Sequence, residues 1–464
     1  MAVSQRRARS LAAPPPSVRW SRQRTLEVGG LLVAVLTPLV FNPLDVNAFE
    51  PLKAAVFQIV TLLMLLAALL PPASALRSGY MARWPYLLYA GAILLATIFS
   101  VDVRRSLWTA RTTADGALTL LSGAIFCWLL GQALTTRRQL TRLLGVLVIG
   151  SVPVTVYGLL QAAGLDPLVW VSDSVSPVLS TVGRSNYLAA YLAMVMPFTL
   201  ALWRSGDEGQ PAHRFGLLFA LQIVCLLLTL ARAAWLGLLV GGLSAGLTLA
   251  RRRPAGSARG GWLLGGLTAG LMGVALLVAM SASALLQPSA YGMRPPVYAQ
   301  LRADSAAARL IFWRASLHLL DGRWLLGYGP GTFGAVVAAA QPAELTAAGP
   351  AAALLDDPHN LLLDRLLQTG VVGLAAYLAV LLAAARQWLR AWRRAEDRQA
   401  VFVLAAMLAA LTAYLVQAQA TPNVMAPDAL FWVTVALAGA APASLGNGHR
   451  QVALSPDRSL ILDL

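Results

Sequence analysis

The residues that could perform catalysis are concentrated in the stretch 356–364, which contains His359. Asp357 and Pro358 have the form of a helix N-cap and a first helical residue, so the pattern predicts that His359 and Asn360 lie in the first turn of a helix. The positive end of the helix dipole disfavours protonation there, and we expect a neutral imidazole that can accept a proton. A general base needs this property. The plain alternative is a histidine that only caps the helix or forms local hydrogen bonds.

Two adjacent carboxylates, Asp356 and Asp357, could in principle hold a divalent cation. Capping of the helix that carries His359 is a simpler role for them. The two cysteines, Cys127 and Cys225, lie inside apolar runs, and the chain has no CxxC motif or Cys/His cluster with the spacing of metal ligands. We therefore expect no metal site and no other cofactor.

The composition indicates which elements must position these residues. Of the 464 residues, 58% are hydrophobic and 12% are charged, and the mean hydropathy is +0.66, which excludes a soluble protein of ordinary composition. Repeated apolar runs have the length that a helix needs to cross the hydrocarbon core of a bilayer, about 17–25 residues. The sequence predicts an all-α polytopic membrane protein with about twelve transmembrane helices, at 27–42, 52–71, 85–100, 117–133, 143–162, 186–203, 215–231, 235–250, 261–285, 370–385, 400–416 and 429–442.

The apolar run 215–250 is too long for one crossing of the bilayer, so we expect it to turn near Arg232. The basic residues set the orientation. If the N-terminus is cytoplasmic and the helices alternate, 24 of the 36 Lys and Arg residues fall on the inner side. This excess is the positive-inside pattern, and it places both termini in the cytoplasm.

The net charge of +16 does not indicate a nucleic-acid partner. The basic loops are short and scattered along the chain, and they lack interleaved aromatic residues on which bases could stack. Attraction to anionic lipid of the bilayer accounts for them more simply.

These predictions divide the chain into five regions: a disordered basic cytoplasmic tail at 1–24, helices one to nine at 25–285, a large outer loop at 286–369, helices ten to twelve at 370–442 and a cytoplasmic tail at 443–464. A loop as long as the one between the ninth and tenth helices usually carries function.

Two elements are predicted inside the large outer loop. Apolar residues at Leu310, Trp313, Leu317 and Leu320 have the spacing of an amphipathic helix over 304–320, on or near the membrane surface. The glycine-rich stretch 327–333 predicts a tight turn in which the backbone approaches another element closely. No strand precedes this stretch, so we do not interpret it as a nucleotide-binding motif.

Four motifs in this order resemble those of the O-antigen ligase and polymerase superfamily of bacterial envelope proteins. They are YGLLQ at 157–161 with STVGRSNYLA at 180–189, TLARAAW at 229–235, the pair Arg309 and Trp313 with LGYGPGTF at 326–333, and HNLLL at 359–363 with TGVVGL at 369–374. The resemblance covers about residues 150–440. The chain departs from the family pattern at Arg184-Ser185, where the family usually has Asn-Pro, and at Ala231, where it often has Ser.

The resemblance implies a metal-independent glycosyltransferase of the GT-C type in polysaccharide biosynthesis of the cell envelope. Such an enzyme moves a glycan from a polyprenyl-diphosphate carrier to an acceptor hydroxyl at the outer face of the bacterial cytoplasmic (inner) membrane. Carried over to this sequence, His359 is the catalytic base, and Arg232 and Arg309 bind the diphosphate. The planar guanidinium group suits this task because it donates two parallel hydrogen bonds to phosphate oxygens.

Three further residues, Asn360, Asn186 and Arg184, are candidates for positioning the sugar or the phosphate. The acceptor could be a glycolipid such as a lipid A core, a growing glycan chain or a protein side chain, so ligase, polymerase and protein glycosylation all remain open. The plain alternatives are an interfacial side chain for Arg232 and a solvated helix residue for Arg309.

Two other classes of protein are alternatives. A transporter of small solutes or ions usually has polar groups at mid-membrane on broken helices in two corresponding halves, whereas the helix centres here are mostly Leu, Ala, Val and Gly. A non-catalytic component of an envelope assembly leaves the pattern of His359, Arg232 and Arg309 without an explanation.

Overall fold

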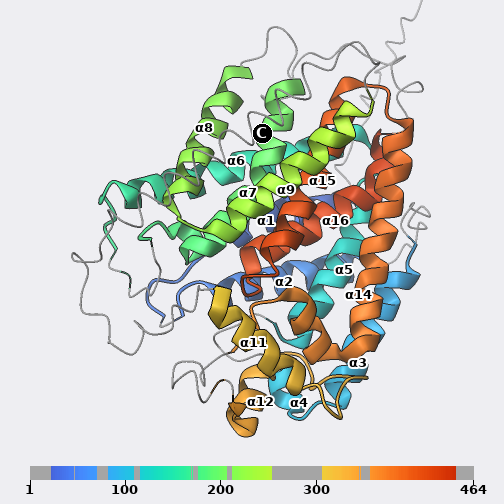
Figure 1. The fold of residues 1–464 in the computed structure, drawn as a ribbon. Coiled ribbons are helices and arrows are strands. Elements are labelled where there is room, and N and C mark those ends of the chain that lie inside the picture. The colour runs from blue at the N-terminus through green and yellow to red at the C-terminus, as the bar shows by residue number, and fades with distance from the viewer. Residues whose placement is uncertain are drawn as a thin grey trace, which may run out of the picture.

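The structure is a computed structural model. It describes residues 22–45, 47–69, 82–108, 115–168, 170, 176–205, 212–252, 306–343, 345 and 356–445. Within these ranges the regular structure is entirely helical, as predicted (Figure 1). The helices are α1 (Arg22–Leu39), α2 (Glu50–Leu69), α3 (Trp84–Ile98), α4 (Val103–Trp108), α5 (Ala117–Ala133), α6 (Arg137–Ala162), the 3₁₀ helix η1 (Ser180–Val182), α7 (Ser185–Ser205), α8 (Ala212–Leu228), α9 (Arg232–Ala250), α11 (Ala306–His318), α12 (Phe333–Ala340), α14 (Leu361–Arg394), α15 (Arg398–Gln417) and α16 (Met425–Leu445).

Eleven of the twelve predicted transmembrane runs fall on these helices, and the run 261–285 lies outside the described residues. Seven described helices are long and apolar enough to cross a bilayer, namely α2, α6, α7, α9, α14, α15 and α16. Three shorter apolar helices lie over 84–98, 117–133 and 213–228. The chain is therefore a polytopic membrane protein.

The predicted turn in the run 215–250 is present. The helix α8 ends at Leu228 and α9 begins at Arg232. Between them Leu230 has a φ of 58°, in the left-handed region that a leucine adopts rarely. The indole of Trp235 on α9 donates a hydrogen bond to the carbonyl oxygen of Leu226 on α8 (3.1 Å), which holds the turn closed.

Contacts between distant segments define the two ends of the bundle. At one end, the backbone N–H of Leu361 donates to Ala418 O (2.9 Å) and that of Met425 donates to Glu50 Oε2 (2.8 Å). We call this the site end. At the opposite end, the Arg142 guanidinium pairs with Glu27 (2.6 Å), and the Arg137 guanidinium pairs with Asp397. The described spans alternate in direction from α1 to α9 and again from α14 to α16, whereas α9 and α14, which are separated by undescribed residues, both begin at the site end.

The helix α16 lies at the centre of the bundle and is buried on nearly all sides (Figure 1). Its Trp432 packs against the backbone of α5, where a Cβ atom added to Gly123 would lie 2.4 Å from Trp432 Nε1. A residue larger than glycine therefore cannot occupy this position without displacing the indole. The close packing fixes α16 against α5.

The helix α14 is broken at Gly370, which has a φ of 64°. The glycine-rich turn predicted at 327–333 and the segment before it fill this break. Val371 N donates to Trp324 O (2.9 Å), and Tyr328 N donates to Leu367 O (2.8 Å). These bonds satisfy backbone groups that the broken helix leaves without intrahelical partners. The predicted close approach of the turn to another element is thus confirmed, and that element is α14.

The predicted amphipathic helix over 304–320 is observed as α11. The side chains that pack inward are Phe312, Ala315 and Leu319, whereas Leu310 and Leu317 are each 52% exposed. Of the predicted apolar face, Trp313 and Leu320 pack in part against this cluster, whereas Leu310 and Leu317 do not pack into the protein. These two leucines stay available to the bilayer surface, and the prediction that the helix lies on that surface remains a prediction.

Candidate active site

His359 lies just before α14, not in its first turn as the sequence pattern predicted. The N-cap is Asn360, whose Oδ1 accepts hydrogen bonds from Leu362 N and Leu363 N (both 3.1 Å). The Asp357 carboxylate is occupied with a turn of its own, since its Oδ1 accepts from His359 N two residues later. This local bond competes with capping by Asp357 and shifts the helix start by three residues. His359 itself adopts a φ of 55°.

The hydrogen bond of the His359 ring determines which nitrogen carries the proton. Nδ1 lies 2.8 Å from the backbone oxygen of Asp357. A carbonyl oxygen only accepts hydrogen bonds, so Nδ1 is the protonated nitrogen and Nε2 carries the lone pair of the neutral ring. The ring is 19% exposed and contacts Phe312 of α11, with ring centroids 5.8 Å apart. The hydrogen bond therefore holds the imidazole in place, and the basic nitrogen is Nε2, which is not the nitrogen bonded to the backbone.

The Asp357 carboxyl group lies beneath the histidine and is only 2% exposed. Its Oδ1 is 3.7 Å from His359 Nδ1. Burial raises the pKa of this carboxyl from 3.8 to about 7, although the hydrogen bond from the His359 backbone N–H acts in the opposite direction. Asp357 can therefore change its charge near neutral pH beside the candidate base.

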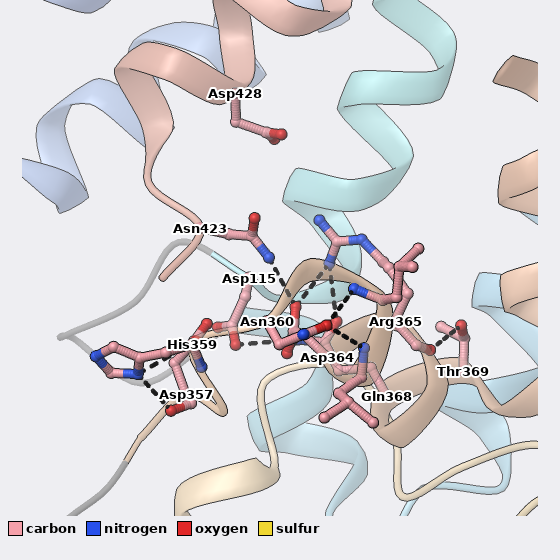
Figure 2. A network of polar contacts seen from close by, with 12 residues as sticks. Asp115, Asp357, His359, Asn360, Asp364, Arg365, Gln368, Thr369, Asn423 and Asp428 are labelled. Atoms are coloured by element: carbon pink, nitrogen blue, oxygen red, sulfur yellow. Dashed lines mark hydrogen bonds and ion pairs between the residues drawn. The ribbon is translucent and has the colours of Figure 1, made fainter. Parts of the chain in front are cut away.

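A buried network of polar side chains follows on the first two turns of α14 (Figure 2). Asp364 Oδ1 accepts from Gln368 Nε2 (2.7 Å), and its Oδ2 accepts from Arg365 Nη1 (3.2 Å) and from Asn423 Nδ2 (2.9 Å). Gln368 also donates to Asp115 Oδ2 (3.2 Å). We call Asp115, Asp364, Arg365, Gln368 and Asn423 the α14 network.

The α14 network joins three segments that are far apart in the sequence. Asp115 precedes α5, Asn423 lies between α15 and α16, and the other members are on α14. Asp364, Arg365 and Gln368 are each at most 2% exposed, and a buried charge is stable only when it is paired and hydrogen-bonded. The network therefore fixes the start of α14, and with it the backbone segment just before the helix, which carries His359.

Sequence reasoning did not single out the α14 network. Asp364 and Arg365 were placed in the outer loop, where charged residues are ordinary. A usable signal was present, because they are adjacent charges within the otherwise apolar stretch 361–367. Asp115 and Asn423 carry no such signal, since each lies in a polar connection where a hydrogen-bonding side chain is unremarkable.

The predicted phosphate-binding arginines are both at the site end. Arg309 lies on α11, three residues before Phe312, which contacts the His359 ring. Arg232 is the first residue of α9 and is exposed. Its N-cap, Ala231, has no side chain that could accept from the first backbone N–H groups of the helix. Arg309 thus lies about one helical turn from the residue that contacts the His359 ring, and Arg232 has no hydrogen bond or ion pair with another described residue.

The three candidate substrate-binding residues have partly local contacts. Asn360 uses its side-chain oxygen as the helix cap, as described above. Asn186 Oδ1 accepts from the neighbouring Tyr187 N (3.1 Å), and the exposed Arg184 lies over the Tyr187 ring (5.7 Å). Their role toward a sugar or a phosphate stays a prediction.

Lys53 has a structural role that the sequence did not indicate. Its ammonium group is fully buried and donates to Val40 O (2.7 Å) and Thr181 O (2.8 Å). It therefore ties the start of α2 to the end of α1 and to the segment before α7. Among the residues that the structure describes, no group of three or more His, Cys, Asp or Glu side chains is arranged to hold a metal ion.

The fold and the site define a multi-pass helical membrane protein with a histidine, arginines and buried carboxylates gathered at one end of the bundle. Residues 217–378 match the family model described as O-antigen ligase. The match supports the O-antigen ligase and polymerase superfamily over this segment, and it confirms the resemblance seen in the sequence motifs. The match contains Arg232, Arg309 and His359, and it ends before Asn423. No curated protein matches the chain.

Proposed function

We propose that this protein is a glycosyltransferase that moves a glycan from a polyprenyl-diphosphate carrier to an acceptor hydroxyl at the outer face of the cytoplasmic membrane. The observation that carries the proposal is the hydrogen bond between His359 Nδ1 and Asp357 O, which leaves the lone pair on Nε2. This base lies inside the O-antigen ligase match together with Arg232 and Arg309. Family membership supports glycosyl transfer of the ligase or polymerase kind.

In the proposed reaction, His359 Nε2 takes the proton of the acceptor hydroxyl while its oxygen attacks the anomeric carbon of the donor sugar. The bond between the anomeric carbon and the diphosphate oxygen breaks, and its electron pair leaves with the diphosphate. The imidazolium that forms keeps its Nδ1 hydrogen bond to Asp357 O. The Asp357 carboxylate, 3.7 Å from Nδ1, stabilises the new positive charge when it is ionised.

The leaving diphosphate needs fixed positive charge. Arg309 on α11 and Arg232 at the start of α9 would supply it, and both are at the same end of the bundle as His359. The first turn of α9 adds the positive end of its dipole, and its backbone N–H groups are not capped by the side chain of Ala231. Diphosphate oxygens can use both kinds of donor at once.

The proposed orientation places the site end at the outer face and both termini in the cytoplasm. The basic pattern of the sequence supports it, because Arg137, Arg142 and Arg252 lie at the opposite end of the bundle. The donor is therefore a lipid-linked glycan in the outer leaflet, and the acceptor is a glycan or a glycolipid.

The test is transfer of glycan from a polyprenyl-diphosphate donor by the purified protein, in the presence of EDTA. We expect wild-type transfer to resist the chelator and the His359→Ala, Arg232→Ala and Arg309→Ala variants to lose it. His318→Ala is the matched control, because His318 is an exposed histidine at the end of α11. Undiminished transfer by His359→Ala, or an equal loss in His318→Ala, would refute the assigned base.

A further inference from the structure

A cavity lies among the membrane-spanning helices. It encloses about 120 Å³ between α8 and α9, with α7 and α15 as its floor. We call it the α8–α9 groove. Its lining extends along α9 from Trp235 to Leu249, which is about 21 Å at the helical rise of 1.5 Å per residue. The groove therefore covers most of the ~30 Å hydrocarbon core of a bilayer.

The groove exists because α8 packs on α7 and lies at the edge of the bundle (Figure 1). On its other face α9 packs closely against α15, where a Cβ atom added to Gly241 would lie 2.4 Å from Ala409 O. At Gly246, which lines the groove, an added Cβ atom would meet no heavy atom within 4 Å. Among the described residues, close packing thus occupies one face of α9, whereas the face that carries Gly246 borders the groove.

The surroundings of the groove are those of a site entered from the bilayer. Leu217 and Val224 on α8 are 64% and 48% exposed, and Leu236 and Leu247 on α9 are 54% and 60% exposed. Apolar surface of this extent on spanning helices is stable in contact with lipid chains. A lipid acyl chain in the groove would be continuous with the hydrocarbon core of the bilayer outside it.

The lining has one charged residue, Arg204, at the opposite end of the bundle from His359. Its guanidinium lies over the ring of Trp203 (5.8 Å), and no described carboxylate pairs with it. Other exposed cations are at the same end of the neighbouring helices, at Arg214 near the start of α8 and Arg251 after α9. The mouth of the groove at this end therefore attracts negative charge.

We infer that the α8–α9 groove binds an anionic phospholipid of the leaflet at this end, with an acyl chain in the groove and its phosphate at Arg204. The apolar lining suits the chain, and the single arginine at the mouth suits a phosphate, to which a guanidinium donates two hydrogen bonds. The site is separate from the proposed transfer reaction, since the diphosphate of the donor would be at Arg232 and Arg309 at the other end. The inference does not depend on the proposed function.

The test measures lipid retained by the full chain after purification in mild detergent. The delipidated protein is then titrated with phosphatidylglycerol or phosphatidylethanolamine and followed by native mass spectrometry. We expect wild type to retain phosphatidylglycerol and to prefer it to phosphatidylethanolamine. Arg204→Gln should lose that preference, with phosphatidylglycerol binding about fivefold weaker.

Gly246→Leu should place an apolar side chain in the groove, since an added Cβ atom there meets no heavy atom within 4 Å, and should abolish retention of either lipid. Gly91→Leu on α3 is the matched control, because an added Cβ atom there also meets no heavy atom within 4 Å, and it should retain lipid like wild type. Equal retention by Gly246→Leu, or no phospholipid on wild type, overturns the inference. Recovery of a polyprenyl phosphate instead would assign the groove to the donor chain and also overturn it. None of these variants alters a proposed catalytic residue, so glycan transfer reports separately on the proposed function.

Discussion

Asp357 contacts His359 in two ways: its backbone oxygen lies 2.8 Å from the ring Nδ1, and its carboxylate oxygen accepts the His359 backbone N–H. The carbonyl sets the tautomer of the ring, and the carboxylate sets the backbone turn that carries it. One residue therefore controls both the chemistry and the position of the candidate base. The same carboxylate is buried, which makes its ionisation depend on the folded state.

The first prediction concerns the pH dependence of stability. Because the pKa of Asp357 is about 7 in the folded protein and 3.8 is its ordinary value, the folded state favours the protonated carboxyl. Its stabilising contribution is complete below about pH 4 and is lost as the pH rises through 7. We expect wild type to lose up to about 4 kcal/mol over this range relative to Asp357→Asn, which keeps a neutral side chain. Unfolding of both proteins in mixed micelles at several pH values measures the difference in their free energies of unfolding. The same pH dependence of stability in both proteins would contradict the prediction.

The second prediction concerns the cap of α14. Asn360→Ala removes the acceptor of two backbone N–H groups and should destabilise the protein by about 1 kcal/mol. Asn360→Asp keeps the acceptor and should preserve the stability, as measured by thermal unfolding in detergent. Transfer activity then separates the two roles of this residue. Loss of activity in a stable Asn360→Asp variant would indicate a contact of the amide with substrate, whereas full activity would leave Asn360 as a cap alone.

The third prediction concerns the break in α14. Gly370→Ala forces a side chain into a φ of 64° and places a Cβ atom 2.1 Å from Leu325 O. We expect a loss of about 1–3 kcal/mol or more in the free energy of unfolding. Gly91→Ala, in an open helical position on α3, should be neutral or slightly stabilising because alanine is the better helix former. Equal effects of the two substitutions would show that the backbone contact at Gly370 is unimportant.

The fourth prediction concerns the buried pair of the α14 network. Asp364→Leu leaves the Arg365 guanidinium buried without its carboxylate and should cost about 3–5 kcal/mol. The double variant Asp364→Leu/Arg365→Leu removes both charges and should cost less than the sum of the two single variants. A double-mutant cycle of unfolding free energies measures this coupling. Additive effects would mean that the two charges are stabilised by other groups and not by each other.

The sequence by itself determined the membrane class, the helical fold and most of the spans. Bilayer thickness imposes a minimum length on every apolar run, and this constraint can be read locally. The turn between α8 and α9 was predictable for the same reason, since a run of about 36 residues exceeds one crossing. The motifs around Arg232, Arg309 and His359 were sufficient to indicate the family, because residue types and their order are properties of the chain alone.

Only the tertiary structure decided how these residues are held. The helix begins after Asn360 and not after Asp357, because the Asp357 carboxylate accepts from His359 N while Asn360 Oδ1 accepts from Leu362 N and Leu363 N. The break at Gly370 depends on the segment 324–329, which lies 39–47 residues earlier in the chain and supplies its backbone hydrogen bonds. The α14 network joins Asp115 to Asn423, and no local pattern records a contact across that separation. Burial, and with it the energetics of a charge, is fixed only when distant helices pack together.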